Sequence, residues 1–135
     1  SVIKRFKIVA KTKDTRIDYA PGIADYYIMG NKKQLDVLFS TLMENAINYS
    51  PPNSIVSVII KKFESSQLYV GIKDQGIGIS EKNIDKIFSE FFRSNNAVEF
   101  HNNGTGLGLS IAMEVAIIHN TTIRVESEIG KGSCF

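Results

Sequence analysis

Two glycine clusters hold the residues of this chain that are best suited to ligand chemistry. They are Asp74-Gln75-Gly76-Ile77-Gly78-Ile79 and Gly104-Thr105-Gly106-Leu107-Gly108-Leu109. The segment between them contains three phenylalanines and Arg93, and a predicted helix ending in Asn45 to Tyr49 precedes both. Glycine lets the backbone approach a ligand closely or adopt positive φ, although one such run alone could form any tight turn. The order of the three segments predicts an ATP site with a movable lid.

Asp74 ends a predicted strand in which Leu68, Val70 and Ile72 alternate onto one face. A period of two places the Asp74 carboxylate on that same inward face. An unpaired buried carboxylate is costly, so a ligand donor such as the exocyclic amine of adenine is the economical partner. The alternative is an aspartate that starts the turn and caps Gly76.

The second cluster precedes a predicted helix, and Gly104–Gly108 therefore fits a phosphate site, because free N–H groups and the positive end of the helix dipole converge there. On its own, this glycine run is as typical of an ordinary loop as of a phosphate site. It is neither a P-loop nor a Rossmann fingerprint. Asn45 offers a neutral oxygen to a hard cation such as Mg²⁺; alternatively it is a satisfied helix-flank amide. Arg93 suits phosphate geometry; alternatively it is solvated.

The remaining candidates have plainer interpretations. Phe88, Phe91 and Phe92 are expected mainly as core or loop anchors. His101 and His119 lack a metal-ligand partner at helical spacing and a nucleophile constellation, so both are expected to be structural or exposed, His119 near a helix end.

Composition limits the class of protein. The chain has 135 residues, a net charge of +2 and 43% hydrophobic residues, which fits one globular domain over residues 1–135. The charge is too small to favour nucleic acid or membrane partners. Cys134 is the single cysteine, so we expect no disulfide and a reducing compartment. No apolar run is long enough for a membrane span, and we expect a soluble piece of a longer chain.

The elements that must position these residues are predicted from periodicity. Residues 5–29 predict a small antiparallel sheet from the runs 6–10, 16–19 and 26–29, with turns at Lys13-Asp14 and Pro21-Gly22. Asn31 caps a helix that ends before Pro51, whose apolar face is Leu35, Leu38, Phe39, Leu42, Ala46 and Tyr49. Its polar flank is Thr41, Asn45 and Asn48.

Further along, strands 55–63 and 68–74 form a hairpin through residues 64–67. A short helix around 84–88 and a mobile polar stretch, 94–103, follow. A helix with the apolar residues Leu107, Ile111, Val115 and Ile118 precedes a last hairpin that turns through residues 130–132. This mixture predicts an α+β, two-layer sandwich with a mixed, mostly antiparallel sheet and three main helices.

Five of these segments together resemble the asparagine, phenylalanine and three glycine boxes of sensor histidine kinases. They are residues 44–51, 74–79, 87–93, 104–109 and 130–135. Five boxes in order across about residues 30–135 are far more specific than any one motif. The resemblance implies the Bergerat ATP-binding fold of the GHKL superfamily.

The resemblance also implies a role for each matching residue. Asn45 would be the Mg²⁺ ligand, Asp74 the adenine-amine acceptor, and the Ser133 hydroxyl a support for the adenine contact. A lid of about residues 89–106 would close over phosphates held by the amides of the second cluster. The implied site residues are Asn45, Asn48, Tyr49, Asp74, Gly76, Gly78, Ile79, Arg93, Gly104, Thr105, Gly106, Leu107, Gly108, Leu109 and Ser133.

Three positions depart from the common pattern of this family. Thr41 stands where many kinases carry Asn and hydrolytic relatives carry a general-base Glu, so hydrolysis should be slow. Asn48 replaces a frequent Lys and removes a phosphate-facing charge, which leaves Arg93 and Mg²⁺ as the compensation. His119-Asn120-Thr121 replaces His-Gly-Gly, which changes only the turn.

The phosphate-accepting histidine of this family lies on a helical dimerisation domain, and nothing in this chain resembles that domain. The implied function is therefore donation of the ATP γ-phosphoryl group to a histidine on that separate domain, with a response regulator downstream. We expect a cytoplasmic domain, monomeric alone and part of a homodimer in a parent protein that can be membrane-bound. The alternatives are a GHKL ATPase, disfavoured by Thr41, and a nucleotide-sensing module without phosphotransfer.

Overall fold

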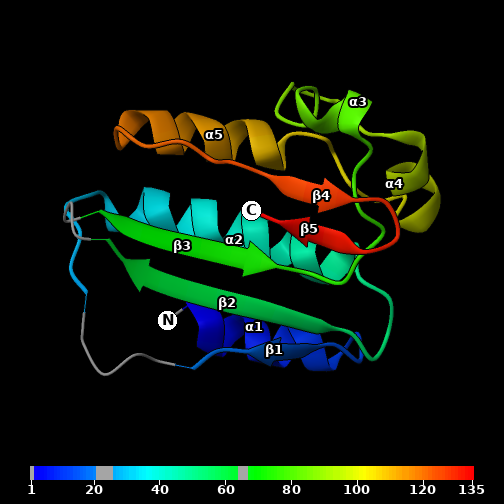
Figure 1. Cartoon of the computed structure of the whole chain (residues 1–135), viewed down its shortest axis with the longest axis horizontal. Coiled ribbons are helices and arrows are strands. Elements are labelled where there is room, and N and C mark those ends of the chain that lie inside the picture. Colours follow the sequence, from blue (N-terminus) through cyan, green and yellow to red (C-terminus); the bar gives the residue numbers. More distant parts are fainter. Residues whose placement is uncertain (1, 21–25, 64–66) are drawn as a thin grey trace.

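The computed structural model describes residues 2–20, 26–63 and 67–135, which form a five-stranded sheet with helices packed on it (Figure 1). The strands are β1 (Arg16–Asp18), β2 (Ile55–Lys62), β3 (Leu68–Lys73), β4 (Glu126–Glu128) and β5 (Gly132–Cys134). Their order in the sheet is β1-β2-β3-β5-β4. Only the β1–β2 pair among these described strands is parallel, so the mixed, mostly antiparallel sheet is confirmed.

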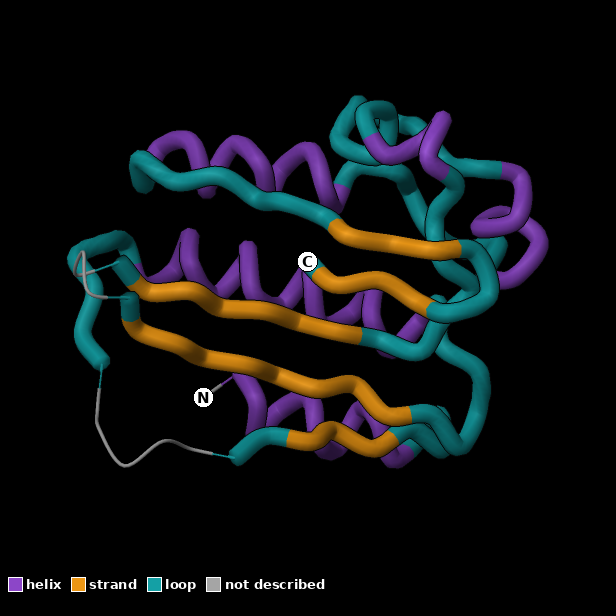
Figure 2. Tube along the Cα trace, in the orientation of Figure 1, coloured by secondary structure: helices purple, strands orange, loops and turns teal. Residues whose placement is uncertain are grey.

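The longer helices of the described residues form a layer against the sheet, and the short helical segments lie towards one end of it (Figure 1). The longer helices are α1 (Val2–Lys11), α2 (Lys32–Asn48) and α5 (Gly108–Ile118). The short ones are α3 (Glu81–Ile84) and α4 (Asn95–Phe100). Helices form one layer and strands the other, which confirms the α+β sandwich; Figure 2 shows loops gathered at the α3 and α4 end.

The core lies between the two layers. Met43 and Ile47 on α2, Val56 on β2 and Ile72 on β3 are its largest fully buried side chains. These residues come from one face of the helix and the inward faces of two central strands, as helical and alternating periodicities require. The hydrophobic effect on this shared face therefore fixes α2 over the centre of the sheet.

The predicted strand over residues 6–10 is wrong, because this run lies in α1. Phe6 and Ala10 are buried, whereas Ile8 and Val9 are exposed. Ile3 also packs against the core, so the inward residues recur at the spacing of three and four that a helix requires. The β-branched residues at positions 8 and 9 favoured a strand locally, and burial of the helical stripe outweighed that preference.

The predicted strand over residues 26–29 is also wrong. These residues have no strand pairing, and Tyr27 and Met29 are almost fully exposed. The predicted antiparallel sheet over 5–29 is thus reduced to β1, which pairs in parallel with β2. The predicted turn at Lys13-Asp14 is present, with Asp14 at φ +51°. The predicted turn at Pro21-Gly22 and most of the loop at 64–67 lie outside the described residues.

The other predicted elements differ from the structure mainly at their ends. Asn31 caps α2 by accepting hydrogen bonds from the amides of Lys33 and Gln34, as expected. The short helix predicted at 84–88 is instead α3, which ends at residue 84, and the polar stretch 94–103 contains α4. On α5 the predicted apolar face is rotated, because Ile111 and Ile118 are exposed while Ala112, Val115 and Ala116 are buried.

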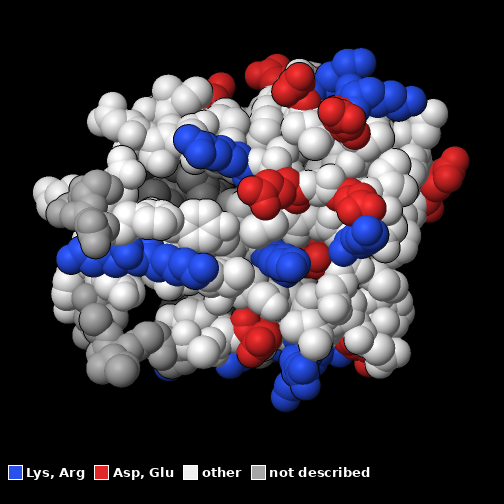
Figure 3. All heavy atoms as spheres, in the orientation of Figure 1, with Lys and Arg blue, Asp and Glu red and all other residues white. Residues whose placement is uncertain are grey.

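The open face of the sheet carries charged side chains of both signs. In Figure 3, Lys and Arg side chains lie among Asp and Glu side chains over the strands. Arg16 and Asp18 on β1, Lys73 on β3 and Glu126 and Glu128 on β4 are all exposed. In the part of the chain that the structure describes, no helix is both long and apolar enough to traverse a bilayer.

We predict that Phe6→Ala lowers the free energy of unfolding by about 3 kcal/mol, because it leaves a cavity where a buried ring joins α1 to the core. Ile8→Ala on the same helix is the matched control, since Ile8 is 70% exposed, and should cost about 0.5 kcal/mol or less. Urea denaturation of both variants measures the difference. Equal losses in the two variants would contradict the assignment of α1 as a core helix.

Candidate functional site

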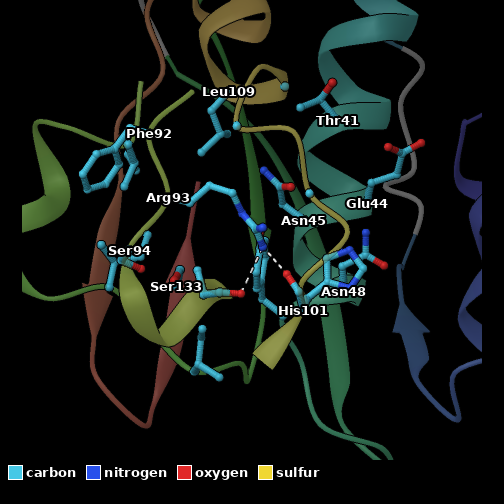
Figure 4. Close-up of a pocket in the computed structure, with 18 of the residues that line it drawn as sticks. Thr41, Glu44, Asn45, Asn48, Phe92, Arg93, Ser94, His101, Leu109 and Ser133 are labelled. Carbon is cyan, nitrogen blue, oxygen red and sulfur yellow. Dashed lines mark hydrogen bonds between the residues drawn. The ribbon is translucent and has the colours of Figure 1, made fainter. Parts of the chain in front are cut away.

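A cavity of about 350 Å³ lies between α2, the end of β3, α4 and the start of α5 (Figure 4). It brings together segments far apart in the chain. Of the residues predicted for the site, the cavity is lined by Asn45, Asn48, Tyr49, Asp74, Gly78, Ile79, Arg93, Gly104, Thr105, Gly106, Gly108, Leu109 and Ser133. The lining residues outside the predicted set are Thr41, Glu44, Ile77, Ile87, Phe92, Ser94, Ala97, His101, Asn103 and Phe135.

Two predicted residues, Gly76 and Leu107, do not line the cavity. A Cβ added to Gly76 would lie 2.4 Å from the carbonyl oxygen of Tyr49, and the next residue, Ile77, donates its N–H to that same oxygen at 3.0 Å. Gly76 thus permits the loop after β3 to pack against the end of α2. Leu107 is the residue before α5, where its N–H donates to Thr105 Oγ1 at 3.3 Å.

Asp74 lies at the floor of the cavity and is only 5% exposed. Its Oδ1 accepts hydrogen bonds from the N–H of Gly76 at 2.8 Å and the N–H of Ser133 at 3.0 Å. The turn-capping geometry expected as the alternative for Asp74 is therefore present. It uses one oxygen, and among the described residues Oδ2 accepts no hydrogen bond. A carboxylate oxygen that has no protein partner and belongs to a residue lining a cavity is available to accept from a ligand donor.

The ionisation of Asp74 reflects two opposing effects. Burial raises the pKa of the Asp74 carboxyl above its ordinary value, and the N–H donors of Gly76 and Ser133 lower that pKa in part. The charged form is thus held in place by the backbone while remaining poorly solvated. A ligand hydrogen-bond donor at Oδ2 would replace solvation that the carboxylate has lost on burial.

Ser133 supplies a second acceptor beside Asp74. Ser127 Oγ donates to the carbonyl of Gly132 at 3.0 Å and accepts from the N–H of Ile79 at 2.8 Å. Because the single hydroxyl proton of Ser127 is used, Ser133 Oγ must be the donor in the 2.8 Å contact between the two hydroxyls. The lone pairs of Ser133 are then left to accept, and the floor of the cavity favours a ligand that presents donors.

The polar flank of α2 forms one wall of the cavity. Thr41, Asn45 and Asn48 all line it, at successive turns of the helix (Figure 4). The Asn45 amide makes no side-chain hydrogen bond among the described residues. The methyl group of Thr41 faces the start of α5, where a Cβ added to Gly108 would lie 3.0 Å from it. Thr41 therefore supports helix packing and brings no titratable group to the cavity.

In Figure 4, Leu109 at the start of α5 and Ser133, whose N–H binds Asp74, are drawn at different ends of the cavity. No side chain in residues 2–20, 26–63 or 67–135 caps this helix N-terminus, and Gly108 and Leu109, at its first turn, line the cavity. The preceding loop turns at Gly106, whose φ is +74° and whose carbonyl accepts the N–H of Phe91 at 2.9 Å. A Cβ on Gly106 would lie 2.7 Å from the carbonyl carbon of Phe91, so only glycine fits there. Uncapped N–H groups at a helix start form an anion site.

Arg93 points into the cavity and is held by α4 and the loop that follows (Figure 4). Its Nη2 donates to the carbonyls of Ala97, at 3.1 Å, and His101, and its Nη1 donates to the carbonyl of Asn102 at 3.1 Å. Nη2 also lies 3.4 Å from the Tyr49 hydroxyl. Arg93 Nε is buried and has no hydrogen-bond partner within the described part of the chain. A phosphate contact would require exchange of at least one of these carbonyls.

His101 lines the cavity, although its sequence context gave no sign of this. Its ring contacts Tyr49 edge to face, with centroids 5.8 Å apart. Burial, followed by the positive charges of Lys13 and Arg93, lowers the pKa of His101 below its ordinary value. Its position depends on α4, which was not predicted, so sequence spacing could not place it here.

His119 has the structural role that was expected for it. Its Nδ1 lies 2.8 Å from the carbonyl of Val115, and its Nε2 accepts the N–H of Asn31 at 3.0 Å. The ring thus joins the end of α5 to the cap of α2. Among the described residues, no three His, Cys, Asp or Glu side chains cluster as a metal site.

Comparison with known proteins identifies the family. The sequence profile described as "Histidine kinase-, DNA gyrase B-, and HSP90-like ATPase" matches residues 30–135. The chain belongs to this family. Its fold, mostly antiparallel sheet and glycine clusters agree with that membership, and the resemblance to sensor histidine kinases expected from the five boxes is confirmed.

Sequence relatives of this family member include two sensor kinases. The sensor-like histidine kinase SenX3 of Mycobacterium tuberculosis (strain ATCC 25618 / H37Rv) is 36% identical over 133 residues, which cover 98% of this chain and 32% of SenX3. The sensor histidine kinase WalK of Bacillus subtilis (strain 168) is 33% identical over 135 residues, covering 98% and 22%. The chain therefore spans less than a third of either relative.

Solved structures agree with the family assignment. The mycobacterial sensor histidine kinase MprB superposes with a TM-score of 0.83 at 25% identity, covering 98% of this chain and 86% of that one. Full-length ShkA, solved in complex with AMPPNP, superposes with a TM-score of 0.84 at 20% identity over 99% of this chain and 27% of ShkA. At 20% identity, the likeness to ShkA shows the fold alone.

We predict that Asp74→Asn changes how stability depends on pH. Because the folded-state pKa is raised, the folded chain holds more protons than the unfolded chain between the ordinary value of 3.8 and the raised value. Wild-type stability therefore has a component that falls as pH rises through this interval, and the variant lacks it. The stability of the variant relative to wild type should rise with pH and level off above the interval.

Urea denaturation between about pH 4 and 7 measures this dependence. Asp18→Asn, which removes an exposed carboxylate from β1, is the control. A stability difference between Asp74→Asn and wild type that does not change with pH would contradict the assigned environment of Asp74.

Proposed function

We propose that residues 1–135 form one catalytic and ATP-binding domain of a sensor histidine kinase. The domain would donate the γ-phosphoryl group of ATP to a histidine on a separate dimerisation domain. A response regulator would receive the phosphoryl group in turn. Sensor kinases among the relatives support this assignment, as does the AMPPNP bound to the structural relative ShkA.

The observation that carries the proposal is the pairing of two chemically different ends in one cavity. At one end, Asp74 Oδ2 and the lone pairs of Ser133 accept hydrogen bonds. At the other, the uncapped start of α5 donates them. Adenine presents an exocyclic amine at its edge, whereas guanine presents a carbonyl there, so the floor favours adenine. Phosphates suit the other end.

The side walls complete a nucleotide site. Tyr49 and Ile79 line the cavity near Asp74 and would contact the base, with Gly78 beside them. Residues 89–106 would form the lid, with Gly104 and Thr105 in its second half. Closure over the phosphates would exclude water and position the γ-phosphoryl group.

Asn45 fits a magnesium site. Its amide lines the cavity and makes no side-chain hydrogen bond in the described part of the chain. A neutral oxygen of this kind suits Mg²⁺, which takes few protein ligands and completes its shell with phosphates and water. When bound, Mg²⁺ supplies positive charge to the phosphates.

The reaction places modest chemical demands on this chain. An imidazole nitrogen of the partner histidine attacks the γ-phosphorus in line, the bond from that phosphorus to the β–γ bridging oxygen breaks, and ADP leaves with the electron pair. The α5 amides and Arg93 would orient the phosphates and balance their charge. The chain alone would be monomeric, and its parent would be a homodimer that presents the histidine.

Hydrolysis of ATP is the competing activity. It needs a base that activates water, and Thr41, on the wall of the cavity, is not titratable and packs against the start of α5. Thr41 thus supplies no base at the position where hydrolytic relatives carry Glu, which supports transfer to an imidazole, itself a nucleophile. A third alternative, nucleotide sensing without transfer, uses the same pocket.

A mixing experiment separates these activities. The chain is incubated with γ-labelled ATP, magnesium and the separately produced dimerisation domain of the parent kinase. We expect label on the histidine of that domain, and no label with Asp74→Asn, whose amide N–H₂ would face the adenine amine donor to donor. Free phosphate alone would indicate an ATPase, and binding without turnover a sensor; either result would contradict the proposal.

We also predict that Asn45→Ala removes the dependence of ATP affinity on magnesium. Wild type should bind ATP more tightly with Mg²⁺ than with EDTA, and the variant should bind equally in both, as measured by calorimetry. Ser40→Ala, on the same helix but outside the cavity lining, is the control. If magnesium strengthens binding to the Asn45 variant as much as to wild type, another group holds the ion.

A further inference from the structure

We propose that Lys13, in the turn between α1 and β1, is a phosphate-binding residue of this site. It would supply the positive charge that the cavity wall itself lacks. The inference rests on the proposed function, because it concerns how the same site holds a nucleotide polyphosphate. Lys13 lies outside residues 30–135, which the family profile matches.

The described lining of the cavity is poor in positive charge. Its charged side chains are the carboxylates Glu44 and Asp74 and the guanidinium of Arg93, with His101 held towards its neutral form. Arg93 already donates to three backbone carbonyls. A polyphosphate entering this cavity therefore meets few available cationic donors, and one metal ion does not balance all of its charge.

Lys13 is positioned to correct this deficit. Its Nζ lies 2.7 Å from Oδ1 of Asn48, which lines the cavity. An ammonium carries three N–H donors, and Asn48 uses one of them. Asn48 is three residues after Asn45, so the two side chains are neighbours on the helix surface. The ammonium is thus next to the end of α2 that would face metal and phosphates.

The Lys13 ammonium also lies close enough to His101 to affect its electrostatics. His101 follows α4, and its ring contacts Tyr49, the residue after Asn48 at the end of α2. The charge of Lys13 contributes to lowering the pKa of this imidazole. The ammonium therefore lies near the part of the cavity lining formed by Asn48, Tyr49 and His101.

The backbone that carries Lys13 is held firmly. The N–H of Lys13 donates to the carbonyl of Ala10 at 3.0 Å, and its carbonyl accepts from Thr15 Oγ1 at 3.3 Å. Ala10 and Thr15 are both buried, and the carbonyl of Asp14 accepts the N–H of Asn53 at 2.6 Å. The turn is therefore anchored on each side, and Asp14 adopts the positive φ that the reversal requires. Only the side chain has to move to reach a phosphate.

Calorimetry with ATP, ADP and adenosine tests the proposal. Lys13→Met should weaken binding of ATP and ADP about tenfold and leave adenosine within about twofold, because only the phosphates contact an ammonium. The loss for ATP should shrink as salt is raised, since the contact is exposed. Lys62→Met is the matched control: it removes the same charge at the far end of β2, about 20 Å along the strand.

A charge relocation tests the position itself. Asn48→Lys in the Lys13→Met background would place an ammonium where the Lys13 ammonium now lies, and should restore most of the ATP affinity. Unchanged ATP affinity in Lys13→Met, or an equal loss for ATP and adenosine, would overturn the role of Lys13 while the site itself stands. If wild type binds neither ATP nor adenosine, the proposed function fails and this inference fails with it.

Discussion

The double hydrogen bond accepted by Asp74 Oδ1 is the interaction on which the rest of the site depends. It joins the end of β3 to β5 through Ser133 and to the glycine turn through Gly76. The glycine turn packs against the carbonyl of Tyr49, the residue that follows α2. Oδ1 of Asp74 thus fixes the positions of β3, β5 and the glycine turn relative to one another, and Oδ2 is left for a ligand. This arrangement buries a negative charge, and the backbone N–H donors offset only part of its desolvation cost.

Two consequences follow for the rest of the cavity. Because α2 is fixed at its end by the loop after β3 and at its start by His119, its polar flank has one orientation over the sheet. Because α5 packs beside α2 through Gly108, its uncapped start is held at the cavity that Asp74 also lines. The acceptor end and the donor end are therefore set by packing of the core, without any ligand.

Sequence reasoning located most of this site because its residues lie in periodic elements or glycine turns. The inward position of Asp74 follows from strand alternation, and the flank of α2 from helical spacing. It failed where tertiary burial overrode local preference, as in α1, where Phe6 and Ala10 decide the structure. It also could not place His101 or Lys13, since each reaches the cavity through contacts with residues far away in the chain.

The hydrogen bond between Phe91 and Gly106 joins the two ends of a segment that contributes several residues to the cavity lining. A loop pinned at its base has already lost the entropy of bringing its ends together, so ordering it over a ligand costs only the freedom of the residues in between. Phe91 adopts a positive φ where it makes this hydrogen bond, so the backbone is strained at that point. Insertions between the two residues should thus alter how quickly ligands exchange while leaving the two-layer scaffold unperturbed.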